Sequence, residues 1–281
     1  MQKAVRKIER AGWSVAAILL LLLVVGCSGR LTHLHQAEGY DPLARDGARY
    51  AIGGFVLRVG EELDGQADVP AAVRNGEVQA QTDTWAPVLY GAMLTGRADL
   101  EIWAWPAVRD NIPADAITAL QRAYAEGRLL PPARFTQLAT DLPDITYLVL
   151  ARLDRNEVEI GSNVPGSTGS QVTDDSRDPH GVNDALIRTV KTRRRVTVTL
   201  DVYDLRTGLS VWSGQAEREK TELYSPGPKD KSEDLVVTPA TEEGGTPEIT
   251  VKGASLAMPE LADVLSDACT ALVGMLFAVE E

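Results

Sequence analysis

Three groups of side chains in this chain have types and spacings that could support chemistry at a metal ion or a nucleophile. His33 and His35 form an H-x-H pair of the kind that binds zinc or copper, but no further histidine, cysteine or clustered carboxylate accompanies them. The acidic stretch at 174–178 lacks the alternating oxygen ligands and the terminal glutamate of a calcium loop. A Ser-His-Asp triad would have to use His180, which lies in a Gly- and Ser-rich stretch without a G-x-S-x-G turn. We therefore expect no metal ion, no cofactor and no catalytic centre.

Cys27 predicts a different chemistry, the attachment of acyl chains to a cysteine. A basic segment with Lys3 and Arg10 precedes the apolar residues 15–25, a run that is too short to span a bilayer and long enough for a signal peptide. Residues 24–27 (VVGC) then match the bacterial lipobox, in which small residues give a peptidase access to the bond before the cysteine. We therefore expect residues 1–26 to be a lipoprotein signal peptide, with an N-terminal transmembrane anchor as the alternative.

The mature chain would then begin at Cys27 and attach to a membrane through more than one acyl chain. We expect residues 27–50, which show no clear apolar period, to be a lipidated tether between the membrane and the domain. In bacterial lipoproteins an aspartate after the cysteine favours retention in the inner membrane. By this resemblance, Ser28 implies a lipid anchor on the periplasmic face of the bacterial outer membrane.

Charge and cysteine content limit the partners and the fold. The chain carries 28 Lys and Arg against 40 Asp and Glu, a net charge of −12, and without residues 1–26 the net charge becomes −15. Such a surface repels the phosphates of nucleic acid, so we exclude nucleic acid as a partner. Once Cys27 is acylated, Cys269 is the one remaining cysteine; no internal disulfide can form, and we expect Cys269 to be a buried core residue.

A cationic run is the best candidate for a partner-binding site in this acidic chain. The run comprises Lys191, Arg193, Arg194 and Arg195 and lies at the start of a predicted strand. Such a cluster could receive phosphates, lipid headgroups or an acidic protein. The alternative is that it neutralises the carboxylates around it and protects a sheet edge from aggregation.

The elements that would position these residues follow from the apolar periodicity. Three strands are predicted, at 51–59, 100–105 and 145–153, and the last should be buried on both faces. Alternation over 196–203, a turn at 204–208 and a return over 209–215 predict a hairpin. Three amphipathic helices are predicted, after Pro113, after Pro132 and over 258–279. The apolar residues 85–94 fit either a helix or a strand.

These elements predict an α/β (α+β) domain over residues 51–281, with a single mixed β-sheet flanked by about three helices. Two segments, at about 161–185 and 225–254, are rich in Gly, Pro, Ser and charged residues. They hold too few apolar residues to offset the entropy lost on ordering. We expect both segments to be flexible insertions.

The predicted hairpin carries a pattern that resembles known envelope proteins. In residues 198–214 (VTLDVYDLRTGLSVWSG), a strand ends in an aspartate, a Thr-Gly turn follows, and the next strand holds Val-Trp. The residues of this pattern are Asp204, Thr207, Gly208, Val211 and Trp212. The pattern, and the order of elements over roughly residues 50–280, resembles the α/β domain shared by periplasmic lipoproteins: the curli secretion lipoprotein CsgG, the penicillin-binding-protein activator LpoB, and the amino-terminal domain of TolB. These positions would serve the fold, through turn capping by Asp204, a positive φ at Gly208 and sheet packing by Trp212.

The resemblance implies a non-enzymatic binding or scaffolding module of cell-envelope assembly. Such a module would be held on the outer membrane by lipid and would act on a protein partner of the envelope. Two alternatives are a subunit of a homo-oligomeric export or secretion complex and an envelope hydrolase. A membrane-spanning pore of the CsgG kind is not expected, because residues 229–234 (KDKSED) are too charged to face lipid.

Overall fold

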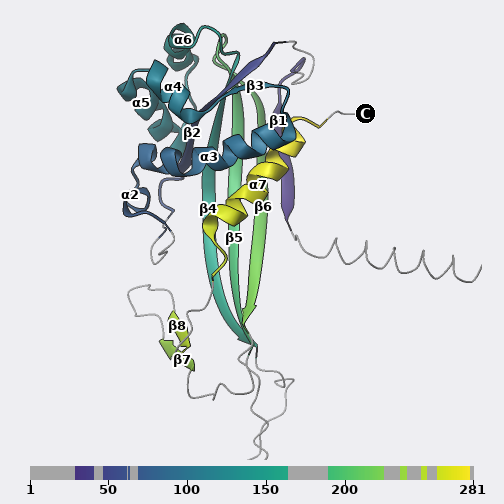
Figure 1. Ribbon diagram of the computed structural model, residues 1–281. Coiled ribbons are helices and arrows are strands. Elements are labelled where there is room, and N and C mark those ends of the chain that lie inside the picture. Colours follow the sequence, from purple (N-terminus) through teal and green to yellow (C-terminus); the bar gives the residue numbers. More distant parts are fainter. Residues whose placement is uncertain are drawn as a thin grey trace, which may run out of the picture.

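The computed structural model describes residues 29–40, 47–61, 63, 69–163, 189–224, 235–238, 248–251 and 258–278. Within them the chain forms a six-stranded mixed sheet in the order β1-β6-β5-β4-β2-β3, which confirms an α/β fold on a single mixed sheet (Figure 1). Its strands are β1 (Arg30–Gln36), β2 (Arg49–Leu57), β3 (Glu101–Trp103), β4 (Tyr147–Asn163), β5 (Thr189–Asp204) and β6 (Ser210–Tyr224). Two further strands, β7 (Leu235–Thr238) and β8 (Glu248–Val251), pair with each other in antiparallel fashion.

The sheet has a parallel half and an antiparallel half. β2 pairs in parallel with β3 and with β4, whereas β4, β5, β6 and β1 pair in antiparallel fashion. Parallel neighbours need crossover connections, and helices supply them here. The described helices are α2 (Ala71–Arg74), α3 (Val78–Gly96), α4 (Trp105–Asn111), α5 (Ala114–Ala125), α6 (Pro132–Asp141) and α7 (Leu261–Leu276). The described residues thus contain six helices where the sequence predicted about three.

Helices pack on both faces of the sheet. α3 and α7 lie side by side across one face (Figure 1), and Gly214 of β6 leaves room there for Met275 of α7. α5 packs on the other face, where the Tyr124 hydroxyl lies 2.7 Å from Oδ2 of Asp201 on β5. Successive side chains of a strand point to opposite faces, and Asp201 lies opposite Ser213 in the β5–β6 register. Helices therefore cover both faces of the half of the sheet that lies at the top of Figure 1.

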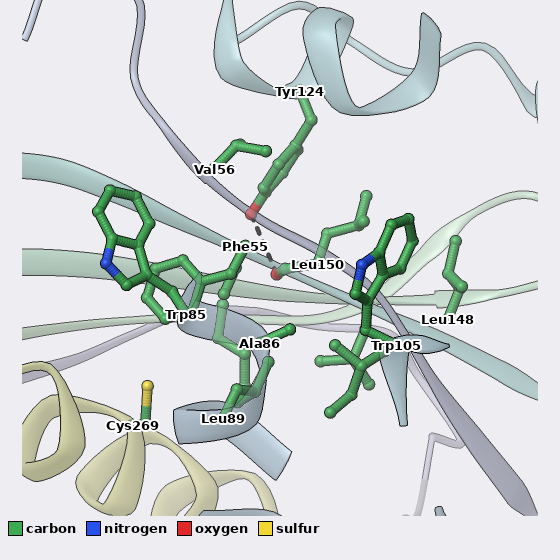
Figure 2. Packing of buried hydrophobic residues seen from close by; sticks show 14 of the residues in the cluster. Phe55, Val56, Trp85, Ala86, Leu89, Trp105, Tyr124, Leu148, Leu150 and Cys269 are labelled. Carbon is green, nitrogen blue, oxygen red and sulfur yellow. Dashed lines mark hydrogen bonds between the residues drawn. The ribbon is translucent and has the colours of Figure 1, made fainter. Parts of the chain in front are cut away.

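The core is built around β4. Its residues 148–151 and Leu153 are at most 1% exposed, which confirms the prediction of a strand buried on both faces. Figure 2 shows Phe55 of β2 packed against Trp85 of α3, with ring centroids 5.6 Å apart. Cys269 of α7 is fully buried in the same cluster, as predicted, and burial raises the pKa of its thiol to about 12.

Residues 85–94, whose sequence fits either a helix or a strand, belong to the 19-residue helix α3. Its residues VQAQTDTWAPVLYGAMLTG place Pro87 in the helix interior, a position that disfavours a helix locally. Tertiary contacts overcome this preference. The Thr82 hydroxyl accepts a hydrogen bond from the backbone N–H of Phe55, and the side-chain carbonyl of Gln81 accepts one from the N–H of Leu57.

The segment expected to be a tether contains a strand. Residues 30–36 form β1, which pairs with β6 from Arg30 opposite Glu217 to Gln36 opposite Trp212. Six of its seven side chains are exposed, so the strand shows no apolar alternation in the sequence. Backbone hydrogen bonds to β6 hold it instead, and the N–H of Ala37 continues them to the carbonyl oxygen of Val211 at 2.9 Å.

Strand pairing enters both of the ranges that were expected to be flexible insertions. β4 runs to Asn163 and β5 begins at Thr189, so strand pairing reaches into the range 161–185. Within 225–254, the β7–β8 pair occupies residues 235–238 and 248–251. The rest of both ranges lies outside the described residues.

Three further predictions also fall outside the described residues: the signal peptide at 1–26, the acylation of Cys27, and the charged stretch at 229–234. Among the helices that are described, none combines the length and the apolar character needed to cross a bilayer.

Removal of the Trp212 ring should destabilise the domain. Trp212 is 1% exposed, so we expect Trp212→Ala to lower the free energy of unfolding by about 3–5 kcal/mol, measured by urea denaturation. The matched control is Leu209→Ala, because Leu209 lies three residues earlier and is 58% exposed. An equal loss in the two variants would show that Trp212 is not a core residue.

Candidate interaction surface

Three strands extend beyond the helices as a ribbon. We call residues 155–163, 189–197 and 217–224 of β4, β5 and β6 the ribbon, and Figure 1 shows it projecting from the sheet. On one face α7 reaches as far as Lys220, whose ammonium lies 2.6 Å from Oδ2 of Asp263. On the face where α5 lies, no described helix covers the ribbon beyond the level of Arg152.

The candidate cationic run lies on the β5 strand of the ribbon, and strand alternation divides it. Lys191, Arg193 and Arg195 share one face, whereas Arg194 lies on the opposite face with 1% of its surface exposed. Lys191 is half-buried and lies opposite Leu223. The run therefore does not form one continuous basic patch.

Arg193 and Arg195 lie between two rows of glutamates on the uncovered face. Arg195 is 3.3 Å from a carboxylate oxygen of Glu219 on β6 and 3.8 Å from one of Glu157 on β4. Arg193 is 2.5 Å from Glu219 and 3.5 Å from Glu159. We call these five residues, which lie on three strands, the ion-pair ladder. In the ladder Arg193 and Arg195 each have carboxylate partners within the chain. A partner-binding role for these two residues stays a prediction.

The residues of the predicted hairpin pattern lie at or next to the turn between β5 and β6, at the end of these strands that is opposite the ribbon. Oδ1 of Asp204 accepts hydrogen bonds from the backbone N–H groups of Arg206 and Thr207, at 2.8 and 3.1 Å. Gly208 has a φ of +69°, and a Cβ at this position would lie 2.6 Å from the backbone of Pro132 at the start of α6. Val211, which is half-buried, accepts the hydrogen bond from Ala37. These residues shape the turn and anchor it to α6 and β1.

A buried polar network, which sequence analysis missed, lies between α5 and the sheet. The Tyr124 hydroxyl contacts Asp201 and, at 3.2 Å, the carbonyl oxygen of Leu150 (Figure 2). Burial raises the pKa of Asp201 above its ordinary value and raises the pKa of Tyr124 well above 10. The sequence signal for this network is the presence of charged residues within an apolar strand pattern. It occurs in residues 148–155 (LVLARLDR) and 198–204 (VTLDVYD).

The network continues along β4. Nε of Arg152 donates to Oδ1 of Asp154 at 2.6 Å, and Nη1 donates to the carbonyl oxygen of Tyr124 near the end of α5 at 3.0 Å. The other carboxylate oxygen of Asp154 accepts from the Thr199 hydroxyl, which also accepts from Gln215. Because each group is satisfied by another side chain or by backbone, the network fixes α5 on the sheet.

A small cavity lies between α3 and the start of α7. It has a volume of about 90 Å³ and is lined by Val69, Thr84, Trp85, Val88 and Leu261, among others. Pockets for small ligands are about 300–1,000 Å³, so this cavity is too small to bury one. Within the described ranges, no group of three or more His, Cys, Asp or Glu side chains could hold a metal ion.

The open edge at β1 is the second exposed feature of the sheet. Leu31 and Leu34 are 42% and 52% exposed, and β6 is the neighbour of β1 within the described residues. His33 stacks on Trp212 with ring centroids 5.9 Å apart, and its Nε2 lies 3.0 Å from the carbonyl oxygen of His35. The H-x-H pair is thus part of an edge strand.

No family model matches the chain, and no curated protein matches it. Among solved structures, two similar chains belong to dodecamers of PelC from Paraburkholderia phytofirmans, the second of them a point variant. They are 12% and 10% identical to this chain, and the alignments cover 90% and 89% of it and 99% of each PelC chain. The TM-score is 0.34 in both cases. The comparisons therefore establish no family for this chain.

The buried Asp201 should leave a signature in the pH dependence of stability. Folding raises the pKa of Asp201 above 3.8, the value in the unfolded chain. Between 3.8 and the raised pKa, the folded protein therefore holds a proton that the unfolded chain has released, and at neutral pH the ionised Asp201 opposes folding. This penalty disappears as the pH falls through the raised pKa. We therefore expect wild type to gain stability relative to Asp201→Asn between about pH 7 and about pH 4 in urea denaturation.

Asp99→Asn is the control with the opposite sign. A hydrogen bond from Arg97, at 2.7 Å, lowers the pKa of Asp99 to about 2, so its contribution is present above 3.8 and is lost only as the pH falls below that value. The difference between wild type and Asp99→Asn should therefore stay flat from about pH 7 to about pH 4. A flat or inverted profile for Asp201→Asn would contradict the burial of an ionisable Asp201.

Proposed function

We propose that this chain is a lipid-anchored, non-enzymatic binding module on the periplasmic face of the bacterial outer membrane, and that it serves cell-envelope assembly. It acts through an open edge of its sheet rather than through a pocket. Supporting this, the exposed features described above are an edge strand and a charged ribbon, and the cavity between α3 and α7 is too small for a substrate.

The single observation that carries the proposal is the position of β1 next to Cys27. Only two residues separate Cys27 from Arg30, the first residue of an edge strand. An edge strand presents unpaired N–H and C=O groups, which a strand from another chain can pair. The exposed Leu31 and Leu34 add apolar area to this edge. A lipid on Cys27 would therefore place a docking edge for an extended protein segment directly at the membrane surface.

A second candidate, a subunit of a homo-oligomeric export complex, is favoured by the opposite edge. β3 forms that edge, so the sheet of the described residues has one edge strand on each side. Two edge strands on opposite sides of one sheet can pair head to tail between copies, and such heterologous contacts form a ring where the rotation between copies closes. The occupant of the β1 edge would then be β3 of a second copy.

Photo-crosslinking in living cells tests the proposed function. We expect a photoreactive residue in place of Leu34 to form a discrete adduct with a membrane-associated protein, because the side chain lies on the open edge. The control position is Leu129, between α5 and α6, which is 98% exposed and remote from β1. A foreign protein in the adduct supports the binding module, and a ladder of self-adducts supports the ring.

The anchor is tested in the same cells. Cys27→Ala should abolish lipid labelling and release the protein into the soluble fraction or leave it uncleaved, and the Leu34 adduct should be lost with the anchor. Equal adducts from positions 34 and 129, or membrane fractionation and lipid labelling that survive Cys27→Ala, would contradict the proposal.

A further inference from the structure

The cavity between α3 and the start of α7 has the size of one aliphatic side chain. Its volume is about 90 Å³. An apolar cavity of about 150 Å³ holds one benzene molecule, so this smaller cavity suits a branched aliphatic group better than an aromatic ring. Protein interfaces often bind through a single side chain that fills such a space. The cavity that is too small for a free ligand therefore fits an anchor residue of a protein partner.

The walls of the cavity are apolar and already fixed. Val69, Trp85 and Leu261 line it, and all three residues are buried. Figure 2 shows the Trp85 ring packed against Phe55, which holds the ring in one position. Because these walls are in place before a partner arrives, insertion of a side chain costs little ordering of the protein.

The residues around the cavity that face solvent are short or acidic. Thr84 of α3 and Ala262 of α7 line it and are exposed. Glu260, which immediately precedes α7, also lines it and is exposed. The Glu260 side chain makes no capping hydrogen bond to α7. Its carboxylate is therefore not engaged by the helix that it precedes.

The charges next to the cavity select a cationic partner. Asp263 and Asp267 are exposed and follow Glu260 by about one and two turns of α7. Lys220 pairs with Asp263 at 2.6 Å, and the N-terminus of α7 contributes roughly half a positive charge. Three carboxylates exceed these two contributions, so the surface stays acidic. A second copy of this chain, whose net charge is −12, would bring like charges to it.

We propose that this cavity is a docking site for a protein partner that inserts one leucine-sized aliphatic side chain between α3 and α7 and places a lysine or arginine beside Glu260. The apolar anchor excludes water, and the cationic neighbour fixes the register of the partner segment. This site is separate from the edge at β1, and it stands independently of the acylation of Cys27.

Fluorine NMR with three short peptides tests the site. The purified protein is labelled with 5-fluorotryptophan, and Trp85→Phe identifies the signal of Trp85. We expect acetyl-Lys-Leu-Lys-amide to shift this signal in a saturable manner, in roughly the millimolar range, because the Trp85 ring lines the cavity. The signal of Trp212, which does not line the cavity, should stay unchanged. Acetyl-Glu-Leu-Glu-amide should bind at least about tenfold more weakly, and acetyl-Lys-Gly-Lys-amide should cause no shift.

Variants of α7 supply the matched controls. Ala262→Leu places an aliphatic side chain at the cavity and should abolish the shift of the Trp85 signal. Ser266→Leu makes a similar change at an exposed position one turn further along α7 and should retain the shift. Glu260→Gln should reduce the difference between the lysine and glutamate peptides. Thermal melting shows that the three variants fold.

Three results would overturn the proposal. They are an unchanged Trp85 signal with the Lys-Leu-Lys peptide, equal shifts from all three peptides, and a shift that survives Ala262→Leu. A shift of the Trp85 signal with protein concentration alone would assign the cavity to a second copy and would also overturn the proposal. None of these results bears on crosslinking from position 34, so the docking edge at β1 is judged separately.

Discussion

β4 pairs with a strand on each side, and its two partners run in opposite senses. From Tyr147 to Leu153 it is parallel to β2 and antiparallel to β5, and this stretch is the apolar centre of the molecule. Beyond the irregularity at Leu153 and Arg155, β4 pairs with the antiparallel strand β5 and with no other described strand. The helices that connect the parallel strands can therefore cover only the first half of β4. The second half, with β5 and β6, must project as the ribbon.

No described helix covers one face of the ribbon, so the ribbon needs another means of keeping its register. A slip of one residue would turn every side chain to the opposite face. The ion-pair ladder opposes such a slip, because Arg193 and Arg195 each meet carboxylates from both neighbouring strands. Ion pairs at a surface contribute little stability, typically about 0–1 kcal/mol each. We therefore infer that the ladder specifies the pairing of the strands more than it stabilises the fold.

Strong apolar patterns predicted most of the fold. β4, the β5–β6 hairpin, α5, α6 and α7 all show continuous, alternating or helical apolar spacing, and all are present. β1 was missed because backbone pairing holds it while its side chains stay exposed. Residues 85–94 of α3 were left open between helix and strand, and Pro87 within them disfavours a helix locally. Strand alternation in the sequence separates Arg194 from Arg193 and Arg195. The facing glutamates, however, lie about 25–40 residues away along the chain, and only the strand register brings them together.

Backbone hydrogen exchange measures the docking edge proposed at β1 directly. In an antiparallel pair, alternate N–H groups of β1 point toward β6 and the others point away. In the purified protein the outward amides of residues 30–36 should exchange rapidly. In outer-membrane vesicles that retain the partner or the second copy, they should become protected to the level of the inward amides. Equal, rapid exchange of the outward amides in both samples would show that no strand occupies the edge and would contradict the central claim.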